Sequence, residues 1–148
     1  MADRSQSESA LVMFSERLTN SAAFGALFRE GMDLVEETAA YLDGDGRNEA
    51  KALERSVSLT YATESMRLTT RLMQLASWLL LQRAVNEGEL TAENARTEKE
   101  KVRFSATPSD RGGPGFEELP ARLRDYIGKG DRLFERVLTR YGLRFSYV

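Results

Sequence analysis

Two arginines, Arg67 and Arg71, are spaced so that both side chains lie on one side of a helix. Two guanidinium groups arranged in this way can hold a phosphate or a carboxylate through paired hydrogen bonds. The simpler interpretation is an ion pair with Glu64, one turn earlier, or with Glu30 on a neighbouring helix. We favour the ion-pair interpretation, and a small anionic or nucleotide ligand at the arginines stays open as the alternative.

The residue types that carry most protein chemistry are missing from this chain, because the sequence has neither cysteine nor histidine. Thiolate nucleophiles, Ser-His-Asp triads and most zinc sites therefore cannot form. The Gly44–Gly46 segment also lacks the Lys-Ser or Lys-Thr ending of a phosphate-binding loop. A reaction based on tyrosine or carboxylate groups would need a deep pocket, which a tight helical bundle rarely offers. We therefore predict no catalytic residue, no metal site and no cofactor, and we expect that the protein is not an enzyme.

The composition is that of a balanced globular protein, with 41% hydrophobic residues, 30% charged residues and a formal net charge of -2. Basic residues are interspersed with acidic ones rather than gathered into a stripe, so neither nucleic acid nor a membrane surface is an expected partner. The start of the chain does not resemble a signal peptide, and the longest apolar run, Leu75–Leu81, is too short to span a membrane. We expect a cytoplasmic protein with one domain.

Three long helical patterns can be read from the spacing of apolar residues, and no strand pattern is convincing. The first runs from about Asn20 or Ser21 to Leu42, where the DGDGRNE segment predicts a turn. The second begins near Ser56 or Ser58 and runs to Glu87, with Gly88 as its C-terminal stop. A short, highly charged helix with Thr91 as its N-cap follows, and the third long helix begins near Pro120 and ends before Gly142.

These patterns predict an all-α fold, an antiparallel three-helix bundle with a long central helix over residues 15–142. Residues 1–14 are expected to be a disordered N-terminal segment, and residues 143–148 a short tail that docks on the bundle. Gly31 and Gly130 each interrupt an apolar stripe. Glycine destabilises the interior of a helix relative to alanine, so its presence there requires compensation. We expect close approach of a neighbouring helix at both positions, although a local kink is the simpler alternative.

The central helix has two adjacent apolar stripes on a helical wheel, and we expect both to face the other two helices. The first stripe holds Ala62, Met66, Met73, Ala76, Leu80 and Ala84, and the second holds Tyr61, Leu68, Leu72, Leu75 and Leu79. The remaining face is largely polar.

Trp78, Leu81 and Val85 form an apolar patch on that polar face. A monomeric three-helix bundle would leave this patch in water, so we predict a contact surface for another protein chain, most simply a second copy. Its residues are Arg67, Arg71, Gln74, Trp78, Leu81, Gln82 and Val85. The tail or the short charged helix could instead fold over the patch within one chain.

The segments LVEETAAYLDGDGR and ESMRLTTRLMQLASWLLLQRAVNEGE resemble the alphaproteobacterial family of the regulator of CtrA degradation. The resemblance covers most of residues 15–95. It implies a three-helix bundle that forms homodimers and acts as an adaptor, without a cofactor of its own. The implied partners are a ClpXP protease primed by a response regulator, a cyclic-di-GMP effector protein and protein substrates of cell-cycle-controlled proteolysis.

Overall fold

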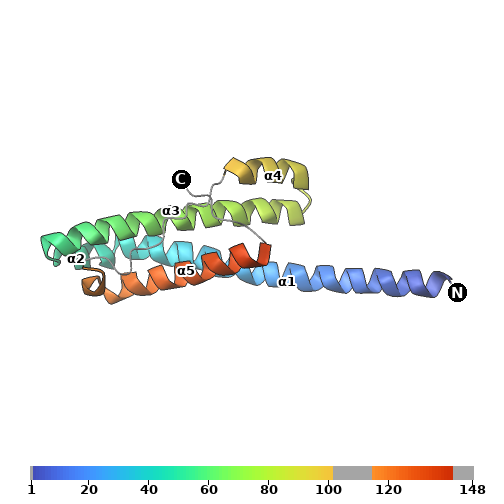
Figure 1. The fold of residues 1–148 in the computed structure, drawn as a ribbon, viewed down its shortest axis with the longest axis horizontal. Helices are drawn as coiled ribbons and strands as arrows, with labels where there is room; N and C mark the ends of the chain where they lie inside the picture. The colour runs from blue at the N-terminus through green and yellow to red at the C-terminus, as the bar shows by residue number, and fades with distance from the viewer. Residues whose placement is uncertain (1, 102–114, 142–148) are drawn as a thin grey trace. The chain divides into compact units, whose positions relative to one another are not determined.

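The structure is a computed structural model that describes residues 2–101 and 115–141. All regular elements in this part of the chain are helices, so the predicted all-α class is confirmed (Figure 1). They are α1 (Ala2–Asp43), α2 (Asp45–Lys51), α3 (Arg55–Asn86), α4 (Ala92–Lys101), the short 3-10 helix η1 (Phe116–Glu118) and α5 (Ala121–Tyr141). Among the helices described, none is both long and apolar enough to cross a membrane.

The chain divides into two units, residues 1–30 and residues 31–148. In the first unit α1 begins at Ala2, whereas residues 1–14 were expected from the sequence to be disordered. The segment before Gly25 contains no glycine or proline to interrupt a helix. Five large apolar side chains of this segment are exposed: Leu11, Val12, Met13, Phe14 and Leu18.

In the second unit, the C-terminal part of α1, α3 and α5 pack against one another. A Cβ atom added to Gly31 of α1 would lie 2.6 Å from Leu79 of α3 and 3.8 Å from Leu133 of α5. A Cβ atom at Gly130 of α5 would lie 3.1 Å from Leu68. The expectation that both glycines permit close approach of a neighbouring helix is therefore confirmed.

The direction of the helices differs in part from the predicted antiparallel arrangement. Along α1, Gly31 lies near Leu79, whereas Gly46, just past its end, lies near Tyr61, so α1 and α3 are antiparallel. Along α5, Gly130 lies near Leu68 and the Tyr141 ring contacts the Trp78 ring, so α5 runs parallel to α3 (Figure 1). Helical periodicity defines a buried face and carries no information about direction, so this correction could come only from the fold.

The ends of the helices follow local chemistry. Gly88 has the positive φ of 76° that suits a residue just after a helix, and it terminates α3 as predicted. Thr91 accepts a hydrogen bond at Oγ1 from the backbone N–H of Asn94, at 3.1 Å, which confirms it as the N-cap of α4. The segment predicted as a turn after the first helix instead forms α2.

The core of the second unit contains the second of the two apolar rows that were predicted for the central helix. Tyr61, Leu68, Leu72, Leu75 and Leu79 are all buried. So are the apolar residues on the inner face of α5, Leu123, Tyr126, Ile127, Leu133, Phe134, Val137 and Leu138. The predicted loop over residues 102–114 and the predicted tail over residues 143–148 lie outside the described residues.

Candidate protein-contact site

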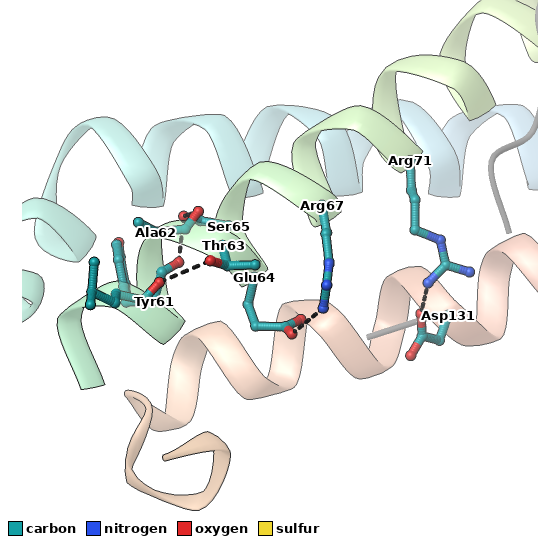
Figure 2. A network of polar contacts seen from close by, with 9 residues as sticks. Tyr61, Ala62, Thr63, Glu64, Ser65, Arg67, Arg71 and Asp131 are labelled. Carbon is teal, nitrogen blue, oxygen red and sulfur yellow. Dashed lines mark hydrogen bonds and ion pairs between the residues drawn. The ribbon is translucent and has the colours of Figure 1, made fainter. Parts of the chain in front are cut away.

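Arg67 and Arg71 extend from α3 toward α5, as Figure 2 shows. Arg67 Nη1 lies 3.1 Å from Glu64 Oε1, so the predicted ion pair with Glu64 is confirmed. Arg71 pairs with Asp131 of α5, and its guanidinium carbon lies 4.5 Å from the centre of the Phe134 ring. Because both arginines are engaged by their own chain, this site is poorly suited to an anionic ligand.

Trp78 is only 2% exposed, so the prediction that its ring stays in water in a single chain is wrong. Tyr141 of α5 packs against it with a ring distance of 4.5 Å, and Lys99 Nζ of α4 lies 4.7 Å from the ring centre. The alternative, in which the short charged helix folds over the patch, is observed at Trp78. A cation over an indole face is favourable, which explains why such a polar helix can cover a tryptophan.

Lys99 fixes α4 to α3 by a second contact, because its Nζ donates a hydrogen bond to Gln82 Oε1 at 2.6 Å. Burial lowers the pKa of Lys99 below its usual value. Gln74, Leu81, Gln82 and Val85 are half-buried. Four of the seven predicted residues thus face α5 or α4, namely Arg67, Arg71, Trp78 and Gln82 (Figure 2). The role of the seven residues as an interface stays a prediction.

One face of α3 remains exposed to solvent, and this was not predicted from the sequence. Four large apolar side chains spaced seven residues apart, here called the α3 stripe, are exposed by 66%, 70%, 59% and 47%: Leu59, Met66, Met73 and Leu80. Three of them belong to the stripe that we expected in the core, and that expectation is wrong. Both apolar stripes satisfy helical spacing, and only the positions of α1 and α5 decide which one is covered.

A depression of about 560 Å³ lies beside Met66 of the α3 stripe, between the end of α1, α2 and α3. Its lining residues are Leu42, Arg47, Ala50, Lys51, Tyr61, Ser65, Met66, Thr69 and Thr70. This feature was missed in the sequence because the segment that carries Arg47 was interpreted as a turn, so no helix was expected there.

A buried tyrosine pair lies beside the depression. Tyr41 Oη donates a hydrogen bond to Glu49 Oε2 at 2.5 Å, and burial and this carboxylate raise the pKa of Tyr41. Burial, followed by the charge of Glu49, also raises the pKa of Tyr61. Within the described part of the chain, no cluster of three or more acidic, His or Cys side chains could hold a metal ion.

Comparison with known proteins identifies the family. Residues 15–140 match the family described as protein of unknown function (DUF1465). The chain is similar to the crystal structure of RcdA from Caulobacter crescentus, with 53% identity, coverage of 78% of this chain and 85% of that chain, and a TM-score of 0.62. No curated protein matches it. The predicted resemblance is therefore confirmed, and the chain belongs to the DUF1465 family, the family of the regulator of CtrA degradation.

Proposed function

We propose that this protein is a non-enzymatic adaptor in the cytoplasm that brings protein substrates, or other adaptors, to a primed ClpXP protease in cell-cycle-regulated proteolysis. The proposal rests on the 53% identity to RcdA, the regulator of CtrA degradation. The other proposed partners are the response regulator that primes the protease and a cyclic-di-GMP effector protein that brings further cargo.

The observation that carries the proposal is the exposed α3 stripe on a chain of this family. Its wheel neighbours Thr63, Thr70 and Ser77 are small and uncharged. A long helix face with exposed Leu and Met and no charge between them is the type of surface that another protein covers. Methionine adapts to partners of different shape, which suits an adaptor that binds several proteins.

A homodimer is part of the proposal. Since Trp78 is covered by its own chain, we assign self-association to another helix face, on the first unit. Leu11, Phe14 and Leu18 of α1 follow an i, i+3, i+7 spacing and are exposed by 64%, 60% and 56%. A two-fold pairing would bury this face on both copies.

The predicted seven-residue surface stays a proposal for a second contact. In the structure a partner could reach the exposed atoms of Arg67, Leu81 and Gln82, which are half-buried. It could reach Trp78 only after α4 moves, because Lys99 and Tyr141 lie against the indole.

No contact among the described residues favours the alternative function, a regulator that binds a small anion at Arg67 and Arg71. Arg71 is paired with Asp131 and stacked on Phe134. Binding a ligand there would first require breaking this pair, whose side chains are only 14% and 25% exposed.

The test is a degradation assay with purified ClpXP, its priming response regulator and a substrate of the pathway, with and without this protein. We expect faster substrate loss when the protein is present, and capture of the primed protease in a pull-down. Absence of both effects for the wild-type chain would reject the adaptor proposal.

Two substitutions separate the proposed surfaces. Met73→Glu places a charge in the α3 stripe and should abolish partner capture with an unchanged solution mass. Phe14→Glu should convert the dimer to a monomer in sedimentation. A wild-type chain that sediments as a monomer at all tested concentrations would contradict the dimer.

A further inference from the structure

The depression between α2 and α3 combines apolar walls with positive charge. Its walls are Leu42, Ala50, Met66 and the Tyr61 ring, and its volume of about 560 Å³ is in the range of ligand-binding sites. Arg47 and Lys51 are the charged residues of its lining, and no carboxylate contributes to it. The depression can therefore accept a group that is partly apolar and partly anionic.

The acidic residues of α2 are directed to other partners. Glu49 accepts a hydrogen bond from Tyr41, and Asp45 pairs with Arg122 of α5 at 2.9 Å. Arg47 and Lys51, one helical turn apart on α2, are exposed and form no ion pair with any described residue. Positive charge beside the depression is therefore not neutralised by its own helix.

The α3 wall of the depression offers few other donors for an anion. The hydroxyls of Ser65 and Thr69 donate hydrogen bonds to the backbone carbonyls of Tyr61 and Ser65, at 2.6 and 2.8 Å. The Tyr61 hydroxyl is buried and has no hydrogen-bond partner among the described residues. An anionic group would therefore be held mainly by Arg47 and Lys51, whose ends carry full charge.

We propose that this depression, continued by the α3 stripe, is the docking groove for an acidic amphipathic helix of a partner protein. The carboxylates of that helix would pair with Arg47 and Lys51, and its apolar residues would cover Met66 and Met73. This inference rests on the proposed adaptor function and specifies the chemistry of the partner.

A helix fits the groove better than a small ligand because the apolar surface extends beyond the depression. Met66 is 70% exposed, and Met73 and Leu80 follow it along the same face, with exposures of 59% and 47%. A small molecule in the depression would leave Met73 and Leu80 in water. An amphipathic helix laid along α3 would cover them by the helix-in-groove mode, in which apolar residues recur every turn.

The experiment is fluorescence anisotropy of the full chain with a labelled synthetic amphipathic helix that has leucines on one face and glutamates beside them. We expect binding that weakens with salt. Arg47→Gln/Lys51→Gln should weaken it about tenfold, the equivalent of about 1.4 kcal/mol. Met66→Ser should weaken it as well. Replacement of the peptide glutamates by glutamine should have the same effect as the double substitution.

The matched control is Arg96→Gln/Arg132→Gln, which removes two exposed charges that do not line the depression and changes the net charge equally. It should bind the acidic peptide like the wild type, and circular dichroism should show the same helicity for both double variants. Any of three results would overturn the groove proposal. They are equal binding by the groove variant and the control, stronger binding of a peptide with lysines in place of the glutamates, and no binding of the acidic peptide.

Inorganic phosphate provides a further arm. If phosphate raises the melting temperature of the wild type but not of Arg47→Gln/Lys51→Gln, and the acidic peptide does not bind, the site is a small-anion site and the helix proposal is wrong.

The degradation assay distinguishes failure of the groove proposal from failure of the adaptor proposal. If the wild type and the groove variant accelerate substrate loss equally, the groove fails and the adaptor function stands. If the wild type has no effect, the adaptor function itself fails.

Discussion

Gly31 and Gly130 lie where neighbouring helices come closest to their backbones. A Cβ atom at Gly31 would lie 2.6 Å from the Leu79 side chain, which is fully buried and cannot move away freely. Gly25 lies on the same helix, and a Cβ atom there would meet nothing within 4 Å. The two glycines therefore have the same helix propensity and different surroundings.

We predict different effects of Gly25→Ala and Gly31→Ala on stability. Gly25→Ala should raise the free energy of unfolding by up to about 1 kcal/mol, because alanine is the better helix former. Gly31→Ala should leave the protein about 1–3 kcal/mol less stable than Gly25→Ala, because its methyl group overpacks the contact with Leu79. Urea unfolding followed by circular dichroism measures both values. Equal stability of the two variants would mean that the bundle relaxes at Gly31 without cost.

The helix α4 packs against α3 but buries little of its own surface. It has 10 residues, of which only Ala95 is buried, and Lys99 makes its described polar contact with α3. An isolated helix of this length is marginal in water, so its stability depends on docking. The same helix shields Trp78, and therefore the state of α4 controls access to the indole.

We predict that Ala95→Glu releases α4 from α3. A carboxylate at a position that is 1% exposed cannot stay buried without a partner. Since Trp78 is the one tryptophan in the sequence, its emission should shift to the red, and acrylamide should quench it more strongly. Arg96→Glu, at an exposed neighbouring position, is the control and should keep the wild-type spectrum. Unchanged emission in Ala95→Glu would show that Tyr141 alone shields the indole.

The stability of the complete fold should depend on pH through Tyr41 and Tyr61. Burial raises the pKa of both tyrosines above the value of about 10 for an unfolded chain. The folded state therefore holds its phenol protons at a pH where the unfolded state releases them. The stabilisation is complete below the unfolded pKa and is lost as the pH rises above it.

We predict a free energy of unfolding that falls as the pH rises above about 10, by up to about 1.4 kcal/mol per pH unit for each tyrosine that stays protonated in the folded state. Tyr41→Phe should reduce this slope, because phenylalanine releases no proton on unfolding. Urea titrations at a series of alkaline pH values provide the measurement. The same slope in Tyr41→Phe and wild type would rule out Tyr41 as a source of the pH dependence.

Local interactions explain which features the sequence alone could predict. The bounds of α3 and α5, the stop at Gly88 and the cap at Thr91 depend on residues within a few positions of one another. The close approaches at Gly31 and Gly130 could also be inferred, because glycine inside an apolar stripe requires compensation from packing. The family could be recognised from two long segments of α1 and α3.

Tertiary packing decided the rest. The wheel of α3 has apolar residues on nearly every side, and only the docking of α1, α4 and α5 determined that Trp78 is covered and that Met66 and Met73 are exposed. The parallel course of α5 and the groove beside α2 depend in the same way on contacts between residues far apart in the chain. Helical spacing in the sequence shows which residues share one face of a helix. Which of these faces becomes buried depends on the free energy of packing the whole chain, and the spacing alone does not contain that information.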